Sequence, residues 1–342
     1  MPRELVATAP RTPVLREYEE PPLAAEQIRI RSQFSAPKHG TEVAFYRGTA
    51  AFINAIFDPQ TKTFIQSAQA AATFPMPLGN MTVGVVTQLG EKVTRFKVGE
   101  RVYGHLPIRE THTVSEGQVH AMPEGMTPEQ IVYLDPGEFA LAAVRDGNIR
   151  LGDKVAVFGV GAIGLMAAQM ARLSGAVQVM VVDPLPIRRE GALRHGADAA
   201  LDPSQLDAGL EIKKMTAGGV DISIETSGNY SALHQAIRCT AFGGLVVALA
   251  FYQGEGLGLR LGEEWHMNRL TMVSSRACSD PNREHPRWDE GRISDTCLRL
   301  LREKRLRVDG LIEPVVPFAR CAEAYRWIDE DPGRTIKMGV VY

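Results

Sequence analysis

The feature that most constrains the fold is a short apolar segment that runs into three closely spaced glycines. Val155–Phe158 is apolar, Gly159, Gly161 and Gly164 follow, and an Ala/Met/Leu-rich stretch comes next. A strand, a glycine turn and a helix in this order start a dinucleotide-binding unit, because glycines permit a tight turn, close approach to phosphates and close helix packing. We therefore predict that a pyrophosphate binds at the helix N-terminus, on a turn that also contains Val160, Ala162 and Ile163.

A carboxylate stands where such a unit binds ribose. The next predicted strand ends at Val182, and Asp183 follows it, 19 residues after Gly164 (183 − 164 = 19). An acid here accepts hydrogen bonds from both ribose hydroxyls and repels a 2′-phosphate, so it favours NAD over NADP. Arg188 and Arg189 follow shortly and could instead bind that phosphate, which leaves NADP as the less favoured alternative.

The pattern of apolar and polar residues divides the chain into two kinds of structure. Short alternating runs and turn-forming clusters predict a β-rich region over residues 1 to about 118, in the manner of a partly closed barrel. From about residue 138, apolar strands alternate with helix-length segments, which predicts a doubly wound parallel sheet of the Rossmann type, an α/β fold. The predicted strands are Val155–Phe158, Val177–Val182, Asp221–Glu225, Leu245–Ala250 and Leu270–Ser274.

Composition excludes several classes of partner. The net charge is −2, so no basic excess points to nucleic acid. No apolar stretch is long enough to cross a bilayer, and the first residues do not resemble a secretion signal. The four cysteines are widely spaced without a C-x-x-C pair, which fits thiols in the cytoplasm. We expect a small-molecule substrate.

Several short motifs together resemble the medium-chain dehydrogenase/reductase superfamily, which is alcohol dehydrogenase-like. Lys97–Val102 looks like its G-D-R-V turn, Leu151–Val157 looks like its lead-in to the nucleotide strand, and Gly40-Thr41-Glu42 resembles its G-[ST]-D tripeptide. The resemblance implies a GroES-like β-barrel catalytic domain closed by the C-terminus (residues 1–136 and 276–342). It also implies a Rossmann NAD-binding domain over residues 137–275. The strands at 244–250 and 272–274 stand where relatives pair their sheets edge to edge, so the resemblance implies a homodimer or homotetramer.

The zinc-binding positions of that family are changed in this sequence. His39 stands at the position of the ligand cysteine, Asn80 at that of the histidine in G-H-E, and Asp135 at the third ligand position. Catalytic zinc takes three ligands from Cys, His and Asp/Glu, and an amide is a poor third. We therefore expect no zinc; if a metal binds at all, His39 and Asp135 would hold it. The pattern resembles a zinc-free branch that includes bacteriochlorophyllide-type dehydrogenases.

Hydride transfer without zinc needs another group to handle the hydroxyl proton and the charge on oxygen. The resemblance implies His39 or Lys38 as the acid/base, Thr41 as a proton relay and Asn80 as the group that binds the substrate oxygen. The expected function is NAD-dependent oxidation of a secondary alcohol, such as a polyol, sugar or cyclitol-like molecule. The alternatives are a zinc-free NADPH-dependent quinone or enoyl reductase, and a non-catalytic NAD(H)-binding sensor or scaffold.

Position on the predicted strands suggests further contacts. Two segments, 49–74 with its Phe57 and Phe64 and 276–288 with its arginines and tryptophan, are expected to shape the substrate pocket. Each contact has a plain packing or surface alternative. Further cofactor contacts are predicted at Thr226, Ser227, Ala250 and Phe251. The family resemblance adds Lys337, which looks like the family's C-terminal cation that reaches the pyrophosphate. Tentative substrate contacts are Glu42, Asp135, Glu138 and Arg276.

Overall fold

The computed structural model describes residues 1–50, 54–67, 74–278 and 282–342. The chain forms two compact units, one made of residues 1–132 and 312–342 and the other of residues 133–311. Among the described helices, none has the length and apolar character needed to cross a membrane.

The second unit is built on a parallel sheet with the strand order β13-β12-β11-β14-β15-β16. This is the order of a doubly wound nucleotide-binding fold, whose direction of winding reverses between β11 and β14. The strands are β11 (Lys154–Phe158), β12 (Gln178–Val182), β13 (Ala199–Leu201), β14 (Val220–Glu225), β15 (Thr240–Ala248) and β16 (Thr271–Ser274). The helices are α3 (Leu134–Asp146), α4 (Ala162–Leu173), α5 (Pro186–Arg194), α6 (Ala208–Met215), α7 (Tyr230–Cys239), α8 (Glu264–Met267) and α9 (Glu290–Arg302).

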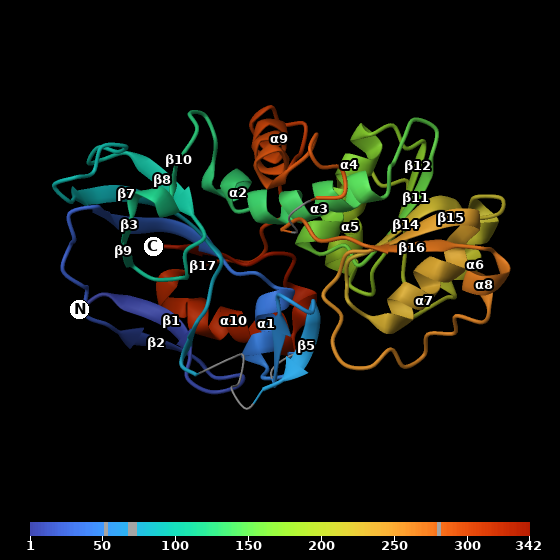
Figure 1. Ribbon diagram of the computed structural model, residues 1–342, viewed down its shortest axis with the longest axis horizontal. Coiled ribbons are helices and arrows are strands. Elements are labelled where there is room, and N and C mark those ends of the chain that lie inside the picture. Colours follow the sequence, from blue (N-terminus) through green and yellow to red (C-terminus); the bar gives the residue numbers. More distant parts are fainter. Residues whose placement is uncertain (51–53, 68–73, 279–281) are drawn as a thin grey trace. The chain divides into compact units, whose positions relative to one another are not determined.

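Helices cover both faces of this sheet (Figure 1). Ala156 and Phe158 of β11 point to the side where Ile212 of α6 and Leu233 of α7 complete an apolar cluster. The alternate residues of β11, Val155 and Val157, are fully buried too, on the side of α4. Burial on both faces is why these strands are apolar throughout, as expected for a parallel sheet.

The first unit is a β-rich structure completed by the C-terminus. Its main sheet has the order β10-β8-β7-β3-β18-β17, and β9 also pairs with β3. The C-terminal strand enters beside β3 through the register pair Val340↔Ser35. The strands are β1 (Arg3–Ala7), β2 (Pro13–Glu17), β3 (Gln27–Ala36), β6 (Met76–Pro77), β7 (Met81–Leu89), β8 (Arg101–Gly104), β9 (Thr111–Ser115), β10 (His120–Ala121), β17 (Val315–Pro317) and β18 (Gly339–Val341). The helices are α1 (Thr41–Tyr46), α2 (Pro128–Ile131) and α10 (Cys321–Glu330).

A hairpin of β4 (Ala55–Asp58) and β5 (Thr63–Gln66) lies in the segment 49–74 that was expected to shape the substrate pocket. Phe57 and Phe64 meet edge to face, with ring centroids 5.3 Å apart, and both are about half exposed. Residues 51–53 and 68–73 of that segment lie outside the described residues.

The border between the units differs from the sequence prediction at residues 133–136 and 276–311. The prediction grouped them with the first domain, whereas the compact units place them with the parallel sheet. The physical reason is α9, whose buried face of Ile293, Cys297 and Leu301 belongs to a helix that packs against α3. The sequence shows that α9 has a charged surface, but it does not show that α9 packs against α3.

Candidate functional site

The glycine turn lies between β11 and α4. Gly159 has a positive φ of 79°, and a Cβ there would come within 2.6 Å of Cβ of Ser227. A Cβ on Gly164 would come within 2.0 Å of the carbonyl oxygen of Gly159. The protein's own packing therefore requires both of these glycines.

Gly161 is different, because the protein itself leaves room for a side chain there. The nearest atom to a Cβ built on it is Nη1 of Arg188, 3.8 Å away. Gly161 is also the N-cap of α4, and no side chain among the described residues caps this helix end. The first amides of the helix are thus open to an anion. The protein's own packing therefore does not account for the glycine at this position.

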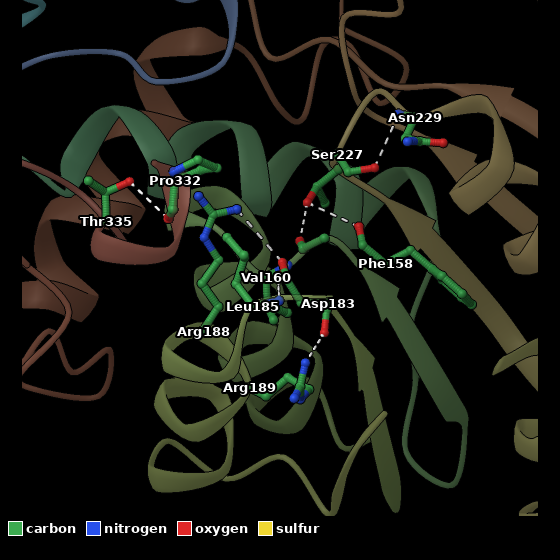
Figure 2. Close-up of polar contacts among 12 residues, drawn as sticks. Phe158, Val160, Asp183, Leu185, Arg188, Arg189, Ser227, Asn229, Pro332 and Thr335 are labelled. Carbon is green, nitrogen blue, oxygen red and sulfur yellow. Dashed lines mark hydrogen bonds and ion pairs between the residues drawn. The ribbon is translucent and has the colours of Figure 1, made fainter. Parts of the chain in front are cut away.

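Asp183 follows β12 and faces this turn (Figure 2). It is only 2% exposed, and its Oδ2 and Oδ1 atoms accept hydrogen bonds from the amides of Val160 and Leu185, each at 2.9 Å. An ionised carboxylate keeps further lone pairs for hydroxyl donors. The carboxylate is therefore held rigidly beside the turn, where a ribose would be bound.

The two arginines after Asp183 have separate environments. Arg189 donates to the carbonyl oxygen of Asp183 at 2.7 Å and pairs with Asp202 at 3.1 Å. Arg188 lies over the turn, with Nη1 3.8 Å from Oδ2 of Asp183. Arg188 is thus the arginine of this pair that lies nearest to the turn.

Glu225, which sequence reasoning did not single out, organises the turn after β14. Its buried carboxylate accepts hydrogen bonds from the amides of Ser227 at 2.7 Å and Gly228 at 3.1 Å, and from the hydroxyls of Ser227 and Tyr252. Burial raises the pKa of this carboxyl group. In the sequence, Glu225 is recognisable only as an acid at the end of an apolar strand. Its partner Tyr252 follows the next strand, so the sequence does not indicate that the two side chains meet.

The predicted contacts near this turn occupy defined places. The hydroxyl of Thr226 donates to the carbonyl oxygen of Gly159, which ties the two strand ends together. Ser227 is exposed beside it, the amide of Ala250 donates to the carbonyl oxygen of Glu225 at 3.2 Å, and Phe251 is 37% exposed. These residues therefore line the carboxyl ends of β14 and β15.

In the first unit, three chain segments meet at the end of β3. The amide of Asn80 donates to the carbonyl oxygen of Ala36 at 3.0 Å. From the C-terminal segment, Lys337 donates through Nζ to the carbonyl oxygen of Pro37 at 3.1 Å, and the amide of Met338 donates to Nε2 of His39 at 3.0 Å. These hydrogen bonds, one between backbone groups and two that involve side chains, thus hold the predicted residues His39 and Asn80 at the same end of one strand.

Glu42 joins the same group from the first turn of α1. Its Oε1 accepts from the hydroxyl of Tyr325 at 2.5 Å, and its Oε2 accepts from the amide of Gly79 at 3.0 Å. Burial raises the pKa of Glu42 from 4.5 to about 7, although the two hydrogen bonds and the charge of Lys337 oppose the rise. The carboxylate acts as a brace between α1, α10 and the 78–80 segment.

His105 follows β8 and carried no signal in the sequence. Its Nδ1 lies 3.4 Å from Oδ1 of Asn80. The Nδ2 atom of Asn80 is buried and has no hydrogen-bond partner among the described residues. Lys38 directly precedes His39 in the sequence, and Thr41 is the first residue of α1. Both side chains are partly buried.

Comparisons with known proteins identify the family. Residues 55–171 match the model described as an alcohol dehydrogenase GroES-like domain, and residues 162–290 match a zinc-binding dehydrogenase model. D-guloside 3-dehydrogenase of Escherichia coli (strain K12) is 43% identical, over 99% of this chain and 100% of its own length. The chain belongs to the medium-chain dehydrogenase/reductase superfamily. It is an alcohol dehydrogenase-like oxidoreductase that uses a nicotinamide cofactor.

Two further comparisons agree with this identification. The (R,R)-butanediol dehydrogenase of Bacillus subtilis (strain 168) is 29% identical over 75% of this chain and 78% of its own length. The crystal structure of 2R,3R-butanediol dehydrogenase from Bacillus subtilis superposes on the dehydrogenase with a TM-score of 0.78, over the whole of both chains at 24% identity. The fold is therefore shared across the full length.

The donor set of this dehydrogenase does not fit the catalytic zinc of its family. Because the amide of Met338 donates to Nε2 of His39, that lone pair is engaged, and the neutral ring carries its proton on Nδ1. The second ligand position holds the amide of Asn80, a poor zinc ligand. Asp135, at the third, is a buried residue in the first turn of α3.

Another group with metal-like spacing is better explained by ion pairs. In the described part of the chain, ligand atoms of His234, Glu263 and Glu264 lie within 4.8 Å of one another. Arg238 donates to Glu264 at 3.0 Å, and Arg260 contacts both Glu263 and His234 at 3.2 Å. Two guanidinium groups already supply the positive charge, so we assign this group to the packing of α8 on α7.

The segment expected to shape the pocket beyond residue 276 is engaged within its own unit. Arg145 and Arg292 stack on the Trp288 ring, with Cζ atoms 3.6 and 4.3 Å from its centroid. Arg145 pairs with Glu284, and Arg276 donates to the carbonyl oxygen of Cys278 at 3.4 Å. These aromatic and cationic groups attach the segment to α3, on which Glu138 is partly buried.

Proposed function

We propose that the dehydrogenase oxidises a secondary hydroxyl group of a sugar glycoside with NAD, and that it does so without catalytic zinc. The observation that carries the substrate class is the full-length similarity to D-guloside 3-dehydrogenase at 43% identity. The buried Asp183 carboxylate beside the glycine turn supports NAD over NADP, because it would repel a 2′-phosphate. The engaged Nε2 of His39 and the amide at position 80 support the zinc-free proposal.

When bound, a nicotinamide cofactor supplies the hydride acceptor at the carbinol carbon. Gly159, Gly161 and Gly164 with the first amides of α4 would bind its pyrophosphate, and Asp183 its ribose. Arg188, Thr226, Ser227, Ala250 and Phe251 remain proposed contacts along the same strand ends. Lys337 is 2% exposed and donates to Pro37, so a cofactor role for it remains a prediction.

The groups of the first unit are proposed to act on the substrate hydroxyl. His39 cannot take a proton on Nε2 while the amide of Met338 donates to it, so its role is to donate from Nδ1 to the substrate oxygen. That leaves Lys38 as the proposed base that takes the hydroxyl proton, with Thr41 as the relay. Asn80 is the second donor to the same oxygen.

The test is a steady-state assay of the purified protein with a panel of D-gulosides, free polyols and simple secondary alcohols. We expect NADH formation with the glycosides, little turnover with NADP, and no loss of activity after treatment with a chelator. Lys38→Met and Lys38→Arg variants should both lose glycoside turnover while they keep NADH binding, because neither side chain can take the hydroxyl proton. Turnover that requires added zinc would refute the proposal. Reduction of quinones with NADPH, without oxidation of glycosides by NAD, would refute it as well.

We also propose a homodimer. Strand β16 lies at the edge of the parallel sheet, and Met272 on it is 38% exposed. Phe242 and Met267, on β15 and α8, are 69% and 70% exposed. Exposed strand edges with apolar neighbours are typical of sheets that pair with a second copy. The test is light scattering coupled to size-exclusion chromatography, in which the mass of a monomer would refute the proposed homodimer.

A further inference from the structure

The Asn80 side chain combines a fixed backbone with an amide that only partly satisfies its hydrogen bonds. The amide of Asn80 donates to Ala36, and the amide of Ile108 donates to the carbonyl oxygen of Leu78 at 2.8 Å. Gly79 has a φ of 115°, and a Cβ there would lie 2.5 Å from the nitrogen of Ile108. The main chain around position 80 is therefore tightly held on both sides.

The side-chain amide is asymmetric in its contacts. Its oxygen faces Nδ1 of His105 at 3.4 Å, while its nitrogen is buried and has no acceptor among the described residues. A buried donor without an acceptor is costly, so its presence calls for an explanation. A ligand oxygen that accepts from Nδ2 provides one.

The His105 contact decides which end of the amide is available. A carboxamide that rotates by half a turn exchanges its oxygen and nitrogen, and the two arrangements fill the same space. With its proton on Nδ1, the His105 imidazole donates to the amide oxygen, and the nitrogen is left to face the ligand. An alcohol oxygen that develops negative charge is stabilised by an N–H donor and destabilised by an amide oxygen.

We propose that His105 is a positioning residue, which orients Asn80 so that Nδ2 donates a hydrogen bond to the substrate oxygen that is being oxidised. This inference rests on the proposed oxidation of a glycoside. His105 does not touch the substrate; it acts through the amide of Asn80. It stands 25 residues from Asn80 in the sequence, on a different loop.

The test compares four variants with the wild-type enzyme in NAD-dependent glycoside oxidation. Asn80→Ala removes the donor and should lower kcat about 100-fold. His105→Ala should lower kcat roughly 10-fold, the value of one hydrogen bond, with little change in KM. His105→Asn places an amide nitrogen near the position of Nδ1 and should restore most of kcat. The double variant with Ala at both positions should equal Asn80→Ala alone.

His120→Gln is the matched control, because His120 is also an exposed histidine of the same unit, whose ring stacks on Tyr103 at 5.5 Å. It should keep wild-type kinetics, and all variants should bind NADH with unchanged affinity by fluorescence titration. Kinetics of His105→Ala that match the control, or losses that multiply in the double variant, would overturn the positioning role alone. Absence of any wild-type glycoside turnover would instead overturn the proposed function, and this inference with it.

Discussion

Replacement of Glu42 by Gln should abolish the loss of folding stability that the first unit undergoes as pH rises. The Glu42 carboxyl group is braced by Tyr325 and Gly79, and burial raises its pKa from 4.5 to about 7. A glutamine can keep both contacts, because its oxygen accepts from the Gly79 amide and its nitrogen donates to the Tyr325 hydroxyl. The variant therefore loses the ionisable proton while it preserves the geometry.

The direction of the effect follows from proton binding. An unfolded chain releases this proton near pH 4.5, whereas the folded unit releases it near 7. Between these values the folded state binds more protons, so its stability is full below pH 4.5 and falls as pH rises through 7. The two values differ by about 2.5 pH units (7 − 4.5), and each unit corresponds to about 1.4 kcal/mol, so the ionised group costs at most about 3.5 kcal/mol at alkaline pH.

The assay is thermal unfolding of both proteins between pH 5 and 8.5, followed by fluorescence of Trp327 in α10. Trp265 and Trp288 belong to the other unit and are replaced by Phe in both backgrounds. The melting temperature of Glu42→Gln should rise relative to the parent by roughly 6 to 12 °C across this range. Glu124→Gln, at an exposed glutamate of the same unit, serves as the control. A constant difference between Glu42→Gln and its parent at every pH would show that Glu42 is ionised in the folded state throughout.

Three further predictions concern the cofactor and the metal. Gly161→Ala should weaken NADH binding at least 10-fold with no change in melting temperature, whereas Gly164→Ala, whose Cβ meets the Gly159 carbonyl oxygen, should lower both binding and stability. Asp183→Asn should weaken NADH binding roughly 10-fold but leave NADPH binding unchanged or tighter, as titration of each cofactor would reveal. Protein purified without chelator should contain far less than one zinc per chain by elemental analysis, and a stoichiometric content would contradict our assignment of the site.

The parallel-sheet unit was predictable because its signals are local. The apolar strand, the three glycines and Asp183 lie within about thirty residues, and the observed strand order confirms the fold expected from them. The GroES-like unit required the family resemblance, because its short strands pair across long sequence distances.

The catalytic half was less predictable because its contacts are not local. His39 was expected as an acid/base candidate, but the donor that engages its Nε2 is Met338, 299 residues away. The orientation of Asn80 depends on His105, and the role of Glu225 depends on Tyr252. His105 in a loop and Glu225 at a strand end belong to no sequence pattern from which their partners could be predicted.

The place of Met338 has a consequence for how the protein is made. The parallel-sheet unit is continuous in the chain, whereas the other unit is assembled from residues 1–132 and 312–342. During synthesis the continuous unit can fold while the ribosome is still at work, but His39 receives its backbone donor only after the C-terminal segment has emerged. Nascent chains would therefore be able to bind the cofactor long before they could catalyse the reaction. A truncation that removes Met338 and the last strand would leave a protein that binds NADH and has no turnover.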